Sequence, residues 1–95
     1  MPLEDEFDRA MLRIYERARD ECGYNGVYFL KMVREHGGLE TARRLLRSQE
    51  VSEGFIVLIE KGRPDLTMEA LVLQQTWEAL FTEEERKIAK ARLER

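Results

Sequence analysis

The fold is decided by residues 25–47, which read NGVYFLKMVREHGGLETARRLLR. Apolar residues recur there at three- and four-residue steps on both sides of Gly37 and Gly38, a spacing typical of amphipathic helices. Two consecutive glycines favour a tight turn, because glycine readily adopts the left-handed backbone conformation that ends helices. The stretch therefore predicts two helices joined by a Gly-Gly turn, which form a compact corner over 26–48.

Asn25 is a good N-cap for the first of these helices, and Gly37 is expected to end it. Its inward face is predicted to contain Tyr28 or Phe29, Met32, Val33 and the near part of His36. The next helix is expected from about Leu39 to Ser48. Its inward face is predicted to contain Leu39, Ala42, Leu45 and Leu46.

The N-terminal segment predicts a helix with one apolar stripe, formed by Leu3, Phe7, Met11, Ile14, Tyr15, Ala18 and Cys22. Acidic residues near its start complement the helix dipole, and Gly23 is placed to end it. Start, stop and period agree, so a helix is predicted here.

Shorter helices are predicted in the second half of the chain. Ser52 can cap a helix over Phe55 to Ile59, although this apolar run also fits a buried strand. A break at 62–65 precedes a segment capped by Thr67. Its apolar residues are Met68, Leu71, Val72, Trp77 and Leu80, and a core position is favoured for Trp77, although the polar residues before it suggest a helix end near the surface. Thr82 and Glu85 match a capping box that opens a last helix. Residues 1–95 are thus predicted to form a single all-α domain of five or six short helices.

Composition limits the class of protein. The chain has 95 residues, of which 43% are hydrophobic and 37% charged, which suits one solvated helical domain. The single cysteine, Cys22, leaves no partner for an internal disulfide and favours a reducing compartment such as the cytoplasm. The acidic N-terminus is unlike a signal peptide, and no apolar run approaches the ~20 residues of a membrane span. We therefore expect neither secretion nor membrane insertion.

The chemistry of the residues indicates no reaction. Metal sites and nucleophilic triads need several convergent ligands or bases, and the chain has one histidine and one cysteine. His36 lies in a predicted last helical turn, where a cation is favoured, and Cys22 occupies an apolar stripe. The run Glu83-Glu84-Glu85 is explained by helix capping. We expect no enzyme activity, no cofactor and no metal.

Charge is segregated along the chain, although the net charge is only −3. Residues 26–49 hold five bases against two acids, whereas residues 50–85 hold nine acids against two bases. The basic set is the one candidate binding surface: Lys31, Arg34, Arg43, Arg44 and Arg47. A solvated helix face is the alternative interpretation. Five acidic residues could meet such a face on a second copy or a partner: Glu50, Glu53, Glu60, Asp65 and Glu69.

Several blocks resemble a family of short, uncharacterised bacterial helical proteins and C-terminal modules. The blocks are ECGYN at 21–25, FLxMVxEHGGLETARRLL at 29–46, GF at 54–55, DLTMEALVL at 65–73 and LFTEEE at 80–85. This chain departs from the family pattern at Gly26, where alanine is expected, and near Leu58 or Ile59, where an aromatic residue is expected. The resemblance implies a bacterial, cytoplasmic protein and supplies no activity or catalytic residue.

Two functions are open at this point. The first is a non-enzymatic module that binds another protein or a second copy of itself, with the face of Arg43, Arg44 and Arg47 as its first candidate contact. The alternative is a nucleic-acid-binding accessory domain. It would use the same arginines together with Lys87, Lys90 and Arg92, provided that the last helix lies beside the third.

Overall fold

The computed structural model describes residues 2–94, and the described chain is all-α. The α-helices are α1 (Pro2–Cys22), α2 (Val27–His36), α3 (Gly38–Arg47), α4 (Glu53–Glu60), α5 (Met68–Val72) and α6 (Glu83–Leu93). Two 3-10 helices, η1 (Pro64–Leu66) and η2 (Gln75–Leu80), stand before and after α5. The predicted fold class is confirmed, and the strand alternative for the segment after Ser52 is wrong, because that segment forms α4.

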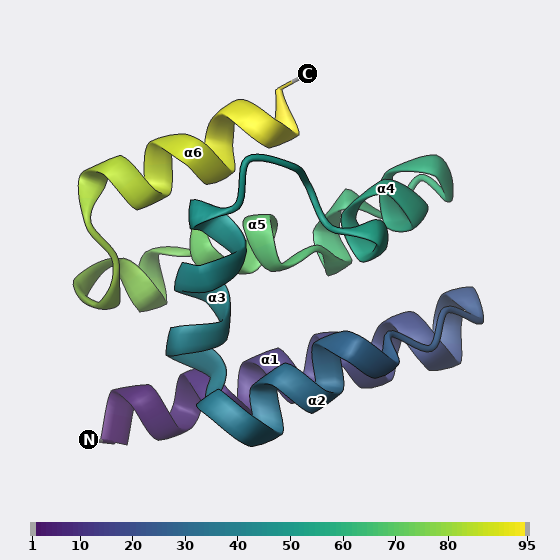
Figure 1. Cartoon of the computed structure of the whole chain (residues 1–95), viewed down its shortest axis with the longest axis horizontal. Helices are drawn as coiled ribbons and strands as arrows, with labels where there is room; N and C mark the ends of the chain where they lie inside the picture. The colour runs from purple at the N-terminus through teal and green to yellow at the C-terminus, as the bar shows by residue number, and fades with distance from the viewer. Residues whose placement is uncertain (1, 95) are drawn as a thin grey trace.

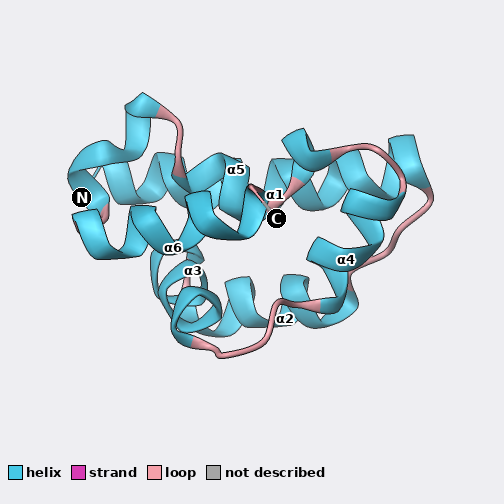
Figure 2. Ribbon diagram, turned by 90° about the horizontal axis from the view of Figure 1, so that it is seen from above, coloured by secondary structure: helices cyan, strands magenta, loops and turns pink. Residues whose placement is uncertain are grey.

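Helices α1 and α2 run side by side, and α3 rises across them toward α6 (Figure 1). Helix α5 lies in the interior beside α6, with α4 standing to one side of it (Figures 1 and 2). None of the helices within residues 2–94 combines the length and apolar character needed to cross a membrane.

The predicted stripe of α1 is confirmed, since Phe7, Met11 and Ile14 are buried in the main hydrophobic cluster. This cluster joins α1 to α2, α3, α5, η2 and α6. A second, smaller cluster of Ala18, Leu58 and Leu66 lies under α4. The molecule therefore has a main core at one end of α1 and a small satellite core at the other.

The Gly-Gly corner forms as predicted, and a contact from α1 fixes it. Gly37 takes a φ of +83°, in the left-handed region. The amide of Gly38 donates a hydrogen bond to Oδ1 of Asp8, so a carboxylate from α1 caps the start of α3. A Cβ on Gly38 would lie 3.0 Å from the Cα of Asp8 and 3.1 Å from Cγ of Met11. The second glycine thus allows α3 to approach α1 closely.

Replacing Gly38 with alanine is expected to lower the free energy of unfolding by about 1–3 kcal/mol, the range for overpacking a tight site. A Gly54→Ala variant is the matched control, because its Cβ would make ordinary contacts of 3.4 Å or more with Tyr24 and Ser52. In urea denaturation, the free energy of unfolding of Gly38→Ala should be lower than that of the wild type, and that of Gly54→Ala should be equal to it or higher. If Gly38→Ala is as stable as the wild type or more stable, the close approach of α3 to α1 does not require glycine at this position.

The start of α2 differs from the prediction. Asn25 does not cap the helix; Gly26 occupies that position without a side-chain hydrogen bond. Asn25 instead accepts a 2.6 Å hydrogen bond from the hydroxyl of Tyr15. Tyr28, one of two candidates for the inward face, is 84% exposed, and His36 is exposed as well. Helical period selects a stripe, but only the neighbouring elements determine how much of it is covered.

The segment after Thr67 agrees with its predicted cap and apolar residues. Thr67 caps α5, which ends at Val72, and the chain turns into η2. Trp77 is buried as predicted, at 7% exposure, with its ring 5.3 Å from that of Phe7. Its indole N–H donates to Oε1 of Gln74. The polar residues before Trp77 mark the turn rather than the surface position of the indole.

The two remaining caps agree with the sequence. Ser52 accepts a hydrogen bond from the amide of Phe55 at the start of α4. Thr82 and Glu85 form both hydrogen bonds of the predicted capping box at the start of α6. The break at 62–65 contains a left-handed Gly62, after which Pro64 opens η1.

Candidate functional site

The predicted basic surface is largely paired with acidic side chains. Arg44 and Arg47 lie 2.9 and 3.6 Å from Oε2 of Glu40. Lys31, on α2, lies 4.0 Å from Glu35. Arg34 is exposed on the same helix. These acidic neighbours weaken the positive field that a phosphate or an acidic partner would meet.

Arg43, one of the predicted surface residues, makes contacts inside the fold. Its guanidinium donates to the carbonyl of Leu80 at 3.0 Å, and Nε lies 3.4 Å from Oε2 of Glu85. The side chain thereby links α3 to the end of η2 and to the first turn of α6. Because this arginine is engaged within the fold, it cannot move to a partner without breaking these contacts.

Helix α6 lies beside α3, the arrangement on which the nucleic-acid alternative depends. One of its three expected bases is nevertheless unavailable, because Arg92 is buried at 8% exposure. Its Nη1 lies 3.0 Å from Oε2 of Glu69, which is itself only 2% exposed. The expectations that Arg92 faces a nucleic acid and that Glu69 belongs to an exposed acidic surface are therefore wrong. A sequence shows charge but not the pairing that makes its burial tolerable.

A different feature offers a binding site: an apolar groove between α2 and α4, of about 360 Å³. This volume lies within the usual range for ligand sites, about 300–1,000 Å³. The floor comes from α1, α3, η1 and α5, and includes Ile14, Leu45, Leu66 and Met68. Five aromatic residues line it: Tyr15, Tyr24, Tyr28, Phe29 and Phe55. The groove lies at the junction between the main core and the satellite core, and residues of both line it.

Tyr24 crosses the groove between its two walls. A Cβ on Gly26 would lie 3.1 Å from Cε2 of the Tyr24 ring, and one on Gly54 would lie 3.4 Å from the same atom. The ring therefore fits against backbone at the start of both α2 and α4. Burial, and next the negative charge of Glu53, raise the pKa of the Tyr24 hydroxyl.

Tyr15 completes this side of the groove. Its hydrogen bond to Asn25 holds the connection between α1 and α2 against α1. The guanidinium of Arg19 lies 5.6 Å from the centre of the Tyr15 ring, a cation–π distance, and pairs with Asp20 at 2.9 Å. One tyrosine of the groove thus already supports a cation within the protein.

Two carboxylates lie at different depths in the groove. Glu69 is at the floor, where burial raises the pKa of its carboxyl while its own backbone amide and Arg92 lower it. Glu53 is exposed at the rim, in the first turn of α4. Among residues 2–94, no lysine or arginine lines the groove. Its polar character is therefore acidic.

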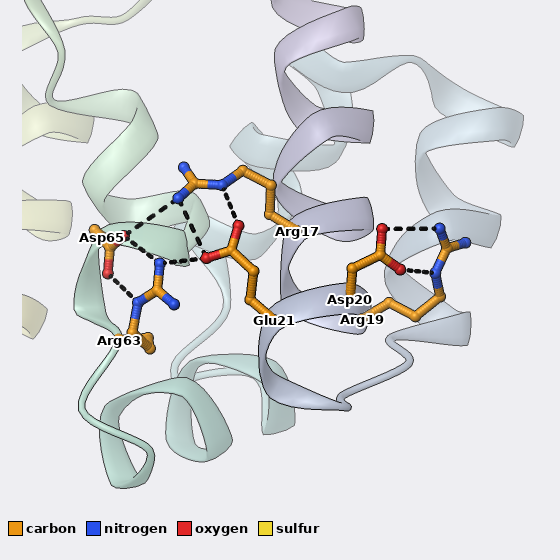
Figure 3. A network of polar contacts seen from close by, with 6 residues as sticks. All are labelled: Arg17, Arg19, Asp20, Glu21, Arg63 and Asp65. Carbon is orange, nitrogen blue, oxygen red and sulfur yellow. Dashed lines mark hydrogen bonds and ion pairs between the residues drawn. The ribbon is translucent and has the colours of Figure 1, made fainter.

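A network of ion pairs fastens the end of α1 to the segment after α4 (Figure 3). Glu21 lies 2.8 Å from both Arg17 and Arg63, and Arg63 lies 3.0 Å from Asp65. Figure 3 shows Arg19 and Asp20 as a separate pair on the other side of α1. The network helps to place η1, and with it the satellite core, beneath α4.

The Glu21 carboxyl is expected to titrate below its ordinary value, because hydrogen bonds from Arg17 and then Arg63 lower its pKa. Its stabilising contribution is present above the pKa of the unfolded chain, about 4.3, and is lost as pH falls through the lower value of the folded state. A carboxyl-detected NMR titration should show this. Arg17→Gln should raise the Glu21 pKa, while Arg13→Gln, one turn away, should leave it unchanged. An unshifted Glu21 in wild type would rule out the network in solution.

The two catalytic candidates lie at opposite ends of α1, His36 in a surface hollow with Glu4, Asp5 and Asp8, and Cys22 at the last residue of the helix. Nε2 of His36 lies 3.9 Å from Glu35, and Cys22 is half-buried beside the satellite cluster. Among residues 2–94, no three His, Cys, Asp or Glu side chains gather closely enough to hold a metal ion.

Comparisons with protein-family models, curated proteins and solved structures found no match to this chain. The resemblance to the bacterial family remains a prediction.

Sequence reasoning missed the groove. Helical period predicts an inward position for Tyr28 or Phe29 and therefore indicates no binding surface there. A usable signal was the presence of glycines at the starts of two helices, Gly26 and Gly54, together with a nearby tyrosine, Tyr24. Glycine has no side chain, so an aromatic ring can pack directly against its backbone.

Proposed function

We propose that this protein is a non-enzymatic helical module that binds an apolar segment of another protein in the groove between α2 and α4. The observation that carries the proposal is the distribution of exposed apolar side chains. Within the described chain, the large hydrophobic residues left exposed are Val27, Tyr28, Ile56 and Ile59. They fall on α2 and α4, the two helices that flank the groove. Val27 and Tyr28 line the groove, whereas Ile56 and Ile59 lie on α4 outside its lining. Exposed apolar side chains that continue into an apolar groove are typical of interaction surfaces.

The groove suits side chains rather than a whole helix. An α-helix with its side chains is about 10–12 Å across, so a partner segment would rest on the rims and insert a few apolar side chains between the walls. The aromatic lining favours such an arrangement, because Tyr and Phe present large, rigid contact areas. The basic face of α3 is less suited, since most of its charges already have acidic neighbours.

The proposal can be tested with peptides selected from a random twelve-residue display library against the whole chain. Selected peptides should shift the amide NMR signals of residues 24–29 and 53–58. Tyr28→Ser should weaken their binding about tenfold or more, the effect of removing a central aromatic contact. Tyr28 is so exposed that this change should leave stability nearly unaltered.

Arg44→Glu combined with Arg47→Glu is the matched control, because it changes the surface that the sequence favoured. Binding should survive this pair of substitutions. Peptides that lose binding in the double arginine variant, and not in Tyr28→Ser, would move the contact to α3 and refute the groove.

A further inference from the structure

The groove combines three features that select the same chemical group. Its aromatic side chains offer ring faces at the rim, where Tyr28 stands almost free of the protein. In the described part of the chain, the lining holds two acidic residues, Glu53 and Glu69, and no basic residue. Glu53 also has no ion-pair partner among the described residues, whereas Glu69 is neutralised by Arg92. Within residues 2–94, the carboxylate of the groove that lacks an ion-pair partner is therefore Glu53.

We propose that the groove recognises partner segments in which a lysine or arginine side chain stands next to an apolar anchor residue, with Glu53 and the ring of Tyr28 receiving the cation. This inference rests on the proposed function and specifies its partner. The apolar anchor enters between α2 and α4, and the cationic side chain lies along the rim. Such side chains are suited to this position, because an apolar stem carries the charged group over hydrophobic surface into water.

A carboxylate, Glu53, and an exposed ring, Tyr28, both belong to the lining of the groove. A cation over a tyrosine face within about 6 Å is attracted by the ring electrons, and an adjacent carboxylate adds a direct ionic contact. The protein contains the same pattern internally, where Arg19 lies over the ring of Tyr15 and pairs with Asp20. At the groove, the ring and the carboxylate are present and the cation comes from the partner.

The satellite core explains why this rim is held in place. Glu53 belongs to the first turn of α4, whose cap, Ser52, accepts from the amide of Phe55. Leu58, on the inner side of the same helix, packs in the cluster with Ala18 and Leu66. The ion-pair network of Glu21 and Arg63 anchors the segment that follows α4 (Figure 3). The carboxylate is thus presented by a helix fixed at both ends.

The test uses the same library selection, followed by a double-mutant cycle. Peptides that bind in the groove should be enriched in Arg or Lys beside an apolar residue. For a selected peptide, replacing this basic residue with Met should weaken binding to the wild-type chain about three- to tenfold, the range of a partly exposed ion pair with a cation–π contact. The same peptide change should have a clearly smaller effect on the Glu53→Gln variant, because the ion pair is gone and only the contact with the Tyr28 ring remains.

Three further variants sharpen the result. Glu60→Gln, at the far end of α4 and outside the groove, should behave as wild type. Tyr28→Leu retains an apolar side chain and should weaken basic peptides more than their Met versions. Glu53→Lys should bind a peptide with Glu in place of the basic residue better than the wild-type chain does, since the charges are then exchanged.

The outcomes separate this inference from the proposed function. Groove-binding peptides without basic enrichment, or a cycle without coupling to Glu53, would overturn the inference and leave the apolar groove intact. If the selected peptides bind Tyr28→Ser as tightly as the wild type, both the proposed function and this inference are overturned. A wild-type dimer that Tyr28→Ser dissociates, measured by sedimentation, would identify a second copy as the occupant and refute a basic partner segment.

Discussion

Replacing Arg92 with methionine is expected to lower the free energy of unfolding by about 3–5 kcal/mol, the loss typical of breaking a buried ion pair. Arg92 donates to Glu69 and to three backbone carbonyls at the end of α3. These carbonyls belong to Leu45, Leu46 and Ser48, at 3.1, 3.4 and 2.7 Å. Without the guanidinium, a carboxylate and helix-end carbonyls would be left buried without partners. Urea denaturation followed by circular dichroism measures the loss.

Lys90→Met is the control for this change, since Lys90 is exposed on the same helix and its replacement should have little effect on stability. A double variant, Arg92→Met with Glu69→Met, should be more stable than Arg92→Met alone, because the unpaired carboxylate is removed with its partner. If Arg92→Met proves as stable as Lys90→Met, α6 does not hold α3 through this side chain.

Replacing Phe7 with alanine is expected to lower the free energy of unfolding by about 3–5 kcal/mol, because it opens a large cavity in the main core. Phe7 is fully buried, and its ring meets those of Trp77 and Phe81 edge-on at 5.3 Å. The contact joins α1 to η2 and to the residue before the capping box of α6. Urea denaturation and thermal melting should show the same large loss.

Tyr28→Ala provides the matched comparison, since it truncates an aromatic residue that is 84% exposed. Its stability should stay within about 0.5 kcal/mol of wild type, as for most surface substitutions. The pair therefore separates an aromatic residue that builds the core from one that we assign to binding. Similar losses in both variants would place Tyr28 in the fold and remove it as a binding residue.

Local signals account for what the sequence predicted correctly. The caps at Ser52, Thr67 and Thr82 each depend on an amide three residues later, so they are visible in a short window. The stripe of α1 and the left-handed glycine after it follow from helix geometry in the same way. The Asn25 cap failed because its side chain found a more distant partner, the hydroxyl of Tyr15.

The candidate site was not predictable to the same degree. Arginines on α3 formed a visible basic set, but the sequence could not show that Arg43 contacts Leu80 and Glu85 or that Glu40 lies between Arg44 and Arg47. Equally, it could not show that Tyr24 inserts between Gly26 and Gly54. Each of these facts depends on which elements become neighbours in space.

By itself, the sequence determined the helices, most of their ends and the apolar stripes that build the core, because these features depend on residues within about four positions of one another. Only the tertiary structure decided that Asp8 caps α3, that Arg92 closes the end of the same helix, and that a groove remains between α2 and α4. Those contacts join residues 30 to 44 positions apart in the first two cases. Burial of a charge or exposure of a ring is set by the packing of distant segments, which a local pattern does not specify.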